Sequence, residues 1–352
     1  MSDTLTEART LLDQQEFEEA LELLKTVQPK DLTVRVCVAR ALSGLGHWEQ
    51  AHTMFSEAVE EDPDCHEAWA GRGLIYFLTG HFQQAAPDFA QAIEAAPMNG
   101  RYRGLQGVLL AQTGDAVAAL KDLEKAYDLG CEEEGFLFAR AQIHLANREA
   151  DKAQEVLSLA EKAGADEAQL AALEGALYML KNDHKEALAS YRFAAEKAPE
   201  SEANWMNLLT LIASLDRGRL LEQAQQALSH HPNSGDIIQV MVGAYREAGK
   251  VKEAFQVLQD AIERDPENPL FYFQLGLGYA NSGKFDQAVV QFSKALKIVP
   301  RFPRALDARG KCLEQLGREE EAKADFERSY EIRKEDAERQ GLSVQPRPQE
   351  SE

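Results

Sequence analysis

A 34-residue period runs through almost the whole chain of 352 residues. Residues 269–302 and 66–99 carry the same residue types at the same offsets. These markers are Tyr272, Gly276, Tyr279, Gly283, Phe285, Ala288, Phe292, Ala295 and Pro300 in the first segment, and Trp69, Gly73, Tyr76, Gly80, Phe82, Ala85, Phe89, Ala92 and Pro97 in the second. A period of this length indicates a stack of small structural repeats rather than ordinary globular domains.

The same period divides the chain into ten repeats. The predicted repeats are residues 1–31, 32–65, 66–99, 100–133, 134–167, 168–201, 202–234, 235–268, 269–302 and 303–336. Nine of them have alanine at position 20, counted from the first residue of the repeat. The exception is 202–234, which is one residue short. Residues 337–352 are predicted to extend the last helix as a polar cap and to end in a disordered tail.

The spacing within each repeat predicts two antiparallel helices, because apolar residues recur with helical periodicity. Glycine at position 8, as in Gly73 and Gly276, and alanine at position 20 allow the two helices to approach closely. Proline near the end of the repeat stops the second helix, because it has no N–H group to donate. Pro87 lies inside a predicted second helix, so we expect it to kink that helix or to delay its start.

The markers, in this order, resemble the signature of the tetratricopeptide repeat family. The resemblance covers nearly the whole chain. It implies an all-α fold, a right-handed superhelical solenoid of antiparallel helix pairs. Such solenoids act as binding frames, so the expected function is a protein–protein interaction scaffold or adaptor with a protein or peptide partner.

In this family the first helix of each repeat lines a concave groove, and positions 2, 5, 9, 12 and 13 point inward. In residues 66–99 this mapping selects Glu67, Ala70, Leu74, Phe77 and Leu78. Across the chain, the candidate groove residues are Ala70, Leu74, Phe77, Phe138, Gln142, Leu145, Ala172, Met179, Met206, Thr210, Arg246, Asn281, Arg304 and Lys311. The centre of the expected groove is apolar to neutral and its C-terminal part is more polar. Either an extended or a helical peptide is compatible with this pattern.

The array has the organisation of a co-chaperone, but it departs from the subclass that grips a chaperone's C-terminal carboxylate. That subclass needs Lys and Asn in one repeat, Asn in the next, and Lys and Arg in a third. Asn207 matches the middle element, yet Ala172 and Ala176 precede it where Lys and Asn are required. The following repeat offers Asp236 and Val240. A chaperone partner is therefore not expected.

The charge balance argues against a nucleic-acid partner. The chain carries 59 acidic and 38 basic residues, a net charge of −21, whereas phosphate backbones are bound by Lys and Arg. The charge is uneven, because residues 1–66 have a net charge of −9 and residues 235–304 have +1. No run of about 18 apolar residues predicts membrane insertion. The first residues lack the pattern of a secretory signal, so we expect a cytoplasmic protein.

No motif in the sequence indicates catalysis. Gly283 and Lys284 resemble part of a phosphate loop, but Phe285 follows where Ser or Thr is required. The four cysteines are far apart and are expected to be reduced thiols. His144 takes the place of a packing tyrosine and is expected in the core. We therefore expect no catalytic residue, no metal site and no cofactor.

Two alternatives to the scaffold remain open. The first is a structural self-assembly unit that forms homodimers or higher oligomers through the solenoid. The second and more remote one is the regulatory subunit of an enzyme. Fold alone does not decide between them.

Overall fold

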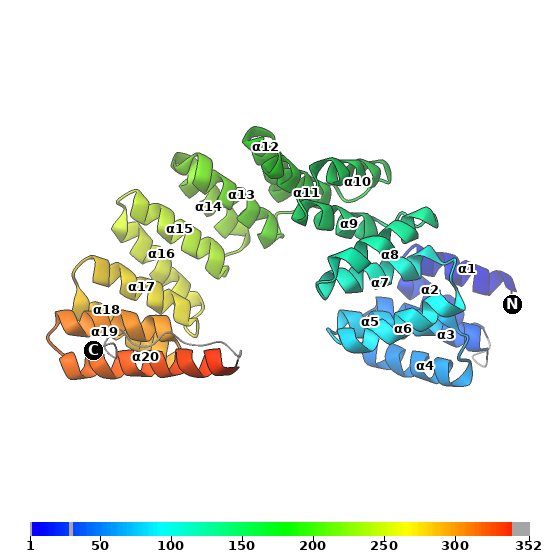
Figure 1. Ribbon diagram of the computed structural model, residues 1–352, viewed down its shortest axis with the longest axis horizontal. Coiled ribbons are helices and arrows are strands. Elements are labelled where there is room, and N and C mark those ends of the chain that lie inside the picture. Colours follow the sequence, from blue (N-terminus) through cyan, green and yellow to red (C-terminus); the bar gives the residue numbers. More distant parts are fainter. Residues whose placement is uncertain (1, 28–30, 340–352) are drawn as a thin grey trace. The chain divides into compact units, whose positions relative to one another are not determined.

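The computed structural model describes residues 2–27 and 31–339, and within these ranges the chain forms 20 α-helices and no strand (Figure 1). Helices that are adjacent in sequence pack against each other. The predicted all-α fold of helix pairs is therefore confirmed. The chain separates into two compact units, Met1–Ser190 and Tyr191–Glu352, which we name the N-terminal unit and the C-terminal unit.

The helices alternate with short turns along the chain. Those of the N-terminal unit are α1 (Ser2–Asp13), α2 (Phe17–Leu24), α3 (Leu32–Gly44), α4 (Trp48–Glu61), α5 (His66–Leu78), α6 (Phe82–Ala95), α7 (Gly100–Gln112), α8 (Ala116–Asp128), α9 (Glu134–Ala146), α10 (Ala150–Lys162) and α11 (Glu167–Leu180). The boundary between the units falls within α12 (His184–Lys197). The C-terminal unit continues with α13 (Glu202–Leu215), α14 (Arg217–His230), α15 (Gly235–Glu247), α16 (Val251–Arg264), α17 (Pro269–Asn281), α18 (Phe285–Ile298), α19 (Pro303–Gln315) and α20 (Glu319–Arg339).

The turn between the two helices of a repeat is a C-terminal cap with a left-handed residue. After α17, Gly283 has φ +70°. The Gly283 N–H donates to the carbonyl of Ala280, and the Lys284 N–H donates to the carbonyl of Tyr279, both at 3.0 Å. These are the two bonds of a Schellman motif, in which glycine is favoured because it has no Cβ. Lys284 is exposed and is the N-cap residue of α18, so this segment is a turn.

Repeat 202–234 builds its turn differently. Only Asp216 separates α13 from α14, and its φ of −148° is not left-handed. The Asp216 carboxylate accepts a hydrogen bond of 3.2 Å from the N–H of Gly218, so the residue that ends α13 also caps the start of α14. This repeat is one residue shorter than the others because its turn is shorter, and both of its helices are 14 residues long.

Small residues allow the close approach of the two helices in a repeat, as predicted. A Cβ atom on Gly73 would lie 2.9 Å from the ring of Phe89, and one on Gly276 would lie 2.6 Å from the ring of Phe292. The nine alanines at position 20 are at most 1% exposed. Gly73 and Gly276 thus leave space for an aromatic ring on the second helix of their repeats.

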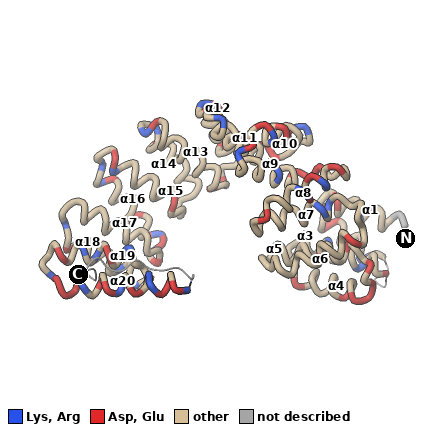
Figure 2. The backbone as a smooth tube through the Cα atoms, viewed as in Figure 1, with Lys and Arg blue, Asp and Glu red and all other residues tan. Residues whose placement is uncertain are grey.

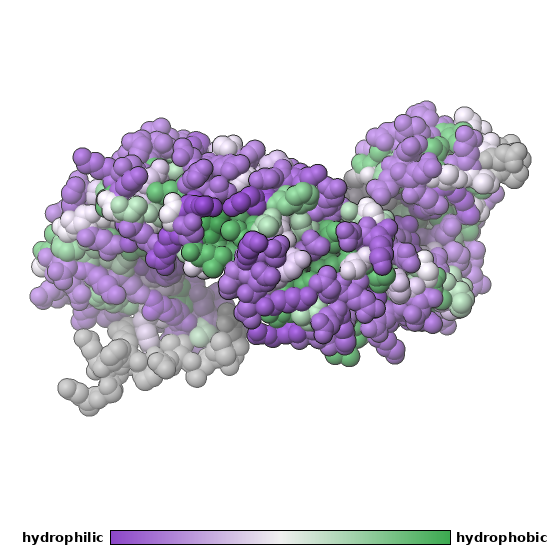
Figure 3. Space-filling view, turned by 90° about the horizontal axis from the view of Figure 1, so that it is seen from above, coloured by the Kyte–Doolittle hydropathy of each residue, from purple (hydrophilic) through white to green (hydrophobic). Residues whose placement is uncertain are grey.

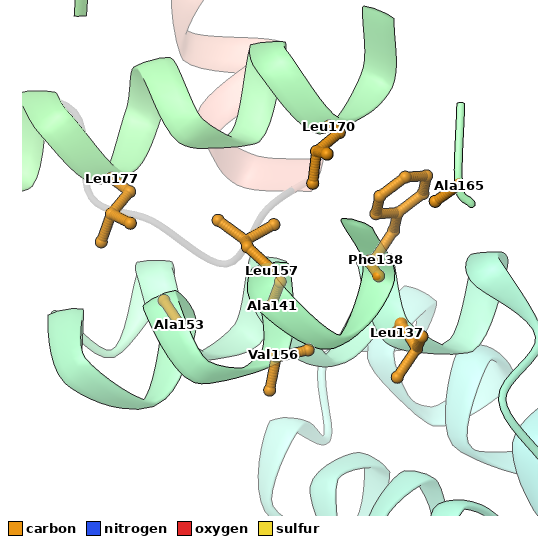
Figure 4. Packing of buried hydrophobic residues seen from close by; sticks show 10 residues of the cluster. Leu137, Phe138, Ala141, Ala153, Val156, Leu157, Ala165, Leu170 and Leu177 are labelled. Atoms are coloured by element: carbon orange, nitrogen blue, oxygen red, sulfur yellow. The ribbon is translucent and has the colours of Figure 1, made fainter. Parts of the chain in front are cut away.

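The core between neighbouring repeats is apolar and consists of several clusters of buried side chains. In Figure 4, Leu157 of α10 points toward Leu170 and Leu177 of α11, and the ring of Phe138 lies beside Ala165. This arrangement buries one side of each helix pair against the next pair, which is the way repeat proteins gain stability.

Repeats 66–99 and 303–336 share an ion pair in which an arginine of the first helix makes two hydrogen bonds to a buried aspartate of the second helix. Arg72 donates from Nε and Nη2 to the carboxylate of Asp88, both at 2.8 Å. Arg309 donates in the same way to Asp325, at 2.7 and 2.6 Å. In both repeats the arginine occupies position 7 and the aspartate position 23. Asp88 is 3% exposed and Asp325 is 6% exposed, so each carboxylate depends on its arginine.

Repeat 134–167 keeps the arginine but lacks the acid. Arg140 occupies position 7, whereas position 23 holds Val156, which is 1% exposed. The Nε and Nη1 atoms of Arg140 are buried and have no hydrogen-bond partner among the described residues. The guanidinium carbon lies 5.5 Å from the centroid of the Tyr127 ring. In this repeat the arginine at position 7 therefore makes a cation–π contact, whereas in repeats 66–99 and 303–336 it contacts a carboxylate.

Two further expectations concern single helices. Pro87 does not delay its helix, because α6 begins at Phe82 and includes the proline. The buried side chains of Ala85 and Phe89, on either side of Pro87, hold this segment in the helix. The last helix, α20, extends to Arg339 and buries Ile332 completely. The predicted tail beyond it, residues 340–352, lies outside the described residues.

Candidate partner-binding groove

A groove of about 1080 Å³ opens on the first helices of the repeats in the N-terminal unit. The helices α1, α3, α5 and α7 and the start of α9 contribute most of its lining. Phe17 and Trp48 come from the starts of the second helices α2 and α4. These helices belong to consecutive repeats, so stacking alone brings their side chains onto one surface.

Several apolar side chains of the groove are accessible. Trp48 is 42% exposed and Leu78 is 50% exposed. Leu74 and Leu105 are half-buried and also line the groove. Several exposed apolar side chains on one concave surface are typical of an interaction site. Figure 3 shows that hydrophilic residues cover most of the visible surface, with hydrophobic residues in separate areas between them.

Ion pairs between helices occupy the polar part of the groove. Arg9 Nη2 on α1 lies 3.2 Å from Glu67 Oε2 on α5, and therefore reaches past α3. Arg40 Nη2 on α3 lies 2.8 Å from Asp13 Oδ1 on α1.

A third pair lies toward α9, where Arg101 Nε is 3.4 Å from Glu133 Oε1. The four residues Arg9, Glu67, Arg101 and Glu133 are all partly exposed in these contacts. Each pair is therefore within reach of a bound molecule.

A buried tyrosine supports the floor of the groove. Tyr102 is 6% exposed, and its hydroxyl lies 2.8 Å from Nδ1 of His66. Burial raises the pKa of Tyr102 to about 12, and the nearby carboxylate of Glu67 adds to the effect. The phenol therefore stays protonated and acts as a hydrogen-bonding group of fixed geometry.

The arrangement is suited to non-covalent binding. The four cysteines are free thiols, and burial raises the pKa of each of them, which disfavours the nucleophilic thiolate. Among residues 2–27 and 31–339, no three His, Cys, Asp or Glu side chains come together as metal ligands. In the same part of the chain, no helix has the length and apolar character that a membrane span requires. His144 is 2% exposed and its Nδ1 lies 2.7 Å from Glu149 Oε2, so it is a core residue as predicted.

The structure brings two of the predicted groove residues into this groove, Ala70 and Leu74. Ala70 is 6% exposed, so it forms part of the floor. Phe138 was expected on the groove surface, but it is 5% exposed and lies in the core beside α10 and α11. That expectation is wrong, because the next repeat packs over the side chain. Phe77 packs near Phe89 and Leu145 packs against the cluster around Leu157.

The other predicted residues lie outside this groove, and their role in binding stays a prediction. Gln142, Thr210, Arg246, Asn281, Arg304 and Lys311 are exposed, whereas Ala172, Met179 and Met206 are half-buried. The guanidinium of Arg304 lies 5.3 Å from the centroid of the Phe273 ring, which holds it against the C-terminal unit.

Sequence reasoning missed Trp48 and the charged residues of the groove other than Glu67. Leu78 and Glu67 occupy inward positions of the repeat, so the pattern already included them. Trp48 begins a second helix, where the pattern predicts no groove residue. The ion pair between Arg9 and Glu67 joins residues 58 apart, and no periodicity indicates such a contact.

Models of one family match this chain in five places. All five are described as tetratricopeptide repeat, or TPR repeat, models, and they match residues 11–75, 79–130, 244–283, 269–302 and 303–336. Together these matches cover more than half of the chain. The chain therefore belongs to the tetratricopeptide repeat family, whose members mediate protein–protein interactions and are usually non-catalytic.

Individual relatives are distant. The general transcriptional corepressor ssn6 of Schizosaccharomyces pombe is 24% identical over 133 residues, which is 37% of this chain and 12% of that protein. Yeast Tom70 is 12% identical, with 94% of this chain and 91% of Tom70 covered and a TM-score of 0.50. PilF of Pseudomonas aeruginosa is 16% identical, with 60% and 96% covered and a TM-score of 0.51. Similarities to structures at this level show the fold alone.

Proposed function

We propose that the groove of the N-terminal unit binds a segment of a partner protein, so that the chain works as an interaction scaffold or adaptor. The observation that carries the proposal is the groove itself, built on consecutive first helices and lined by the exposed side chains of Trp48 and Leu78. Proteins of this family mediate protein–protein interactions, which supports the class of function.

The size of the groove favours a peptide over a metabolite. Pockets for small ligands have volumes of about 300–1,000 Å³ and enclose most of the ligand. This groove has a volume of about 1080 Å³, at the upper end of that range, and its lining comes from five consecutive repeats rather than from one enclosed pocket. A chain segment with several side chains fills such a space, whereas a metabolite would leave much of it in contact with water.

The accessible apolar side chains can supply useful binding energy. Burying a whole leucine side chain is worth about 1.5–3 kcal/mol, so the exposed half of Leu78 offers about 1 kcal/mol. Tryptophan is enriched among the residues that dominate interface energies. We therefore expect Trp48 and Leu78 to be anchor points of the interface.

A screen of random displayed peptides against the full chain tests the proposal. The best binder is then measured by fluorescence anisotropy with Leu78→Asp and with the control Val117→Asp. Val117 is 83% exposed and does not line the groove, so the two variants add the same charge at an exposed apolar site. We expect Leu78→Asp to weaken binding by about tenfold or more and Val117→Asp to change it little.

Circular dichroism of both variants shows whether the helices are intact. The proposal fails if no peptide is enriched, or if both variants weaken the binder equally. Self-assembly and the role of an enzyme's regulatory subunit stay predictions, as do the cytoplasmic location and the absence of a nucleic-acid partner. Sedimentation over a dilution series would reveal a homo-oligomer.

A further inference from the structure

The two units differ strongly in charge. Residues 1–190 carry 33 acidic and 16 basic side chains, a net charge of −17, whereas residues 191–352 carry 26 and 22, a net charge of −4. Figure 2 shows that acidic positions are frequent along the helices of the N-terminal unit. The unit that holds the groove is therefore the one with the stronger negative potential, which attracts cations and repels anions.

The arginines of the groove do not reverse this potential. Each of the three lining arginines, Arg9, Arg40 and Arg101, has a carboxylate oxygen within 3.4 Å. Glu134 also lines the groove, and its carboxylate accepts a hydrogen bond from the backbone N–H of Asp166. The lining thus holds three arginines and four carboxylates, and the arginines are already engaged.

We propose that the segment bound in this groove is a basic, amphipathic peptide of a partner protein. This inference rests on the proposed function. The apolar side chains of the peptide contact Leu78 and Trp48. Its Lys or Arg side chains meet the carboxylates of Asp13, Glu67 and Glu133, which can accept further hydrogen bonds beside their arginines because an ionised carboxylate has about four acceptor sites. An arginine of the peptide can also stack on the ring of Trp48, which is 42% exposed.

Charge complementarity is what selects this partner among apolar segments. An acidic peptide would approach a unit of charge −17 against repulsion, and its carboxylates would compete with Asp13, Glu67 and Glu133 for the arginines. A basic peptide gains from the general field during approach and from individual carboxylates once bound. The attraction between the peptide and the overall negative charge of the unit weakens as salt is added, because the Debye length is only about 8 Å at physiological ionic strength.

Three synthetic peptides of equal length and identical apolar residues provide the probes. Their polar positions are all Lys, all Gln or all Glu. Fluorescence anisotropy with the full chain should give a Kd for the Lys peptide about tenfold or more below that of the Gln peptide, and the Glu peptide should bind least. Raising the salt concentration should weaken the Lys peptide and leave the Gln peptide nearly unchanged.

Two triple variants with equal net charge separate the groove from the general field. The groove variant is Asp13→Asn, Glu67→Gln and Glu133→Gln. The control variant is Glu57→Gln, Glu60→Gln and Glu124→Gln, which changes exposed residues of the second helices α4 and α8 that do not line the groove. We expect the groove variant to lose about tenfold or more in affinity for the Lys peptide and the control variant to lose much less.

The inference is overturned if the two triple variants weaken the Lys peptide equally, or if the Gln or Glu peptide binds as tightly as the Lys peptide. Should the groove variant fail to fold, the comparison of the three peptides and the salt series on the unaltered chain still decide. Equal binding of all three peptides, lost in Leu78→Asp but kept in Val117→Asp, would leave the proposed function standing and refute only the basic partner. If Leu78→Asp left the affinity for all three peptides unchanged, both the proposed function and the basic partner would be refuted.

Discussion

Replacing Val156 by aspartate should cost far less stability than burial of a carboxylate normally does. Val156 is 1% exposed and occupies position 23, where Asp88 and Asp325 accept two hydrogen bonds each from the arginine at position 7. Arg140 already stands at position 7 with Nε and Nη1 unpartnered. The new carboxylate is therefore expected to meet a guanidinium that is in place.

The expected magnitude follows from three contributions. Losing the buried valine costs about 1.5–3 kcal/mol. Each hydrogen bond between charged groups returns about 1.5–3 kcal/mol. Two such bonds offset the lost valine together with the desolvation of the new carboxylate, which costs several kcal/mol, so Val156→Asp should stay within about 2 kcal/mol of the original chain. Without Arg140, the carboxylate is a buried and unpaired charge, which costs about 3–5 kcal/mol. The coupling between Arg140→Leu and Val156→Asp should thus be about 3 kcal/mol.

A double-mutant cycle measures this coupling. Urea unfolding followed by circular dichroism gives the free energies of the four chains, and native-state hydrogen exchange in α9 and α10 gives the local values if the transition is not two-state. Val156→Asn serves as the control, because the asparagine side chain has nearly the same shape as that of aspartate but carries no charge. A coupling below about 0.5 kcal/mol, or an Asn variant as stable as the Asp variant at neutral pH, would refute the reasoning.

Three smaller predictions concern stability. Gly276→Ala should destabilise the chain by about 1–3 kcal/mol in urea titrations, because the new Cβ would lie 2.6 Å from an atom of the Phe292 ring. A Cβ on Gly243 would have no neighbouring atom within 4 Å, so Gly243→Ala should stabilise its helix by about 0.5–1 kcal/mol in the same titrations. Arg148→Gly should stabilise the chain by up to about 1 kcal/mol, because Arg148 has φ +61°; an unchanged or lower melting temperature would contradict this. Burial, and then the charge of Glu161, raise the pKa of Glu174, so the ionised form destabilises the fold at neutral pH and the penalty disappears below the ordinary pKa of 4.5. Glu174→Gln should therefore raise the melting temperature at pH 7 but have little effect at pH 4; an equal effect at both would count against this cause.

The fold could be predicted because its markers act locally. Gly283 is needed by the cap of its own helix, and Gly276 is needed by the ring sixteen residues later. The delayed helix start that Pro87 could have caused is absent, because tertiary packing of Ala85 and Phe89 keeps the segment helical despite the missing N–H group. Local markers thus suffice unless packing with the neighbouring helix overrides them.

The groove could be predicted only in part. Leu74 and Leu78 follow from their positions in the repeat, because those positions face the concave side. Phe138 occupies an equivalent position, yet the depth to which the next repeat covers it depends on side chains of α10 and α11. The pair of Arg9 and Glu67 depends on how far an arginine reaches across α3, which no repeat pattern encodes.

The pairwise packing of neighbouring helices also bears on how the chain folds during synthesis. Within each unit, the helices that pack closely are adjacent or next but one in the sequence. Local contacts close short loops at low entropic cost, so such chains fold fast, and a pair can dock on the preceding one as soon as it leaves the ribosome. The ion pair of Arg9 with Glu67 reaches further and must wait for α5. The groove of the N-terminal unit is therefore completed late, after each of its helix pairs has already formed.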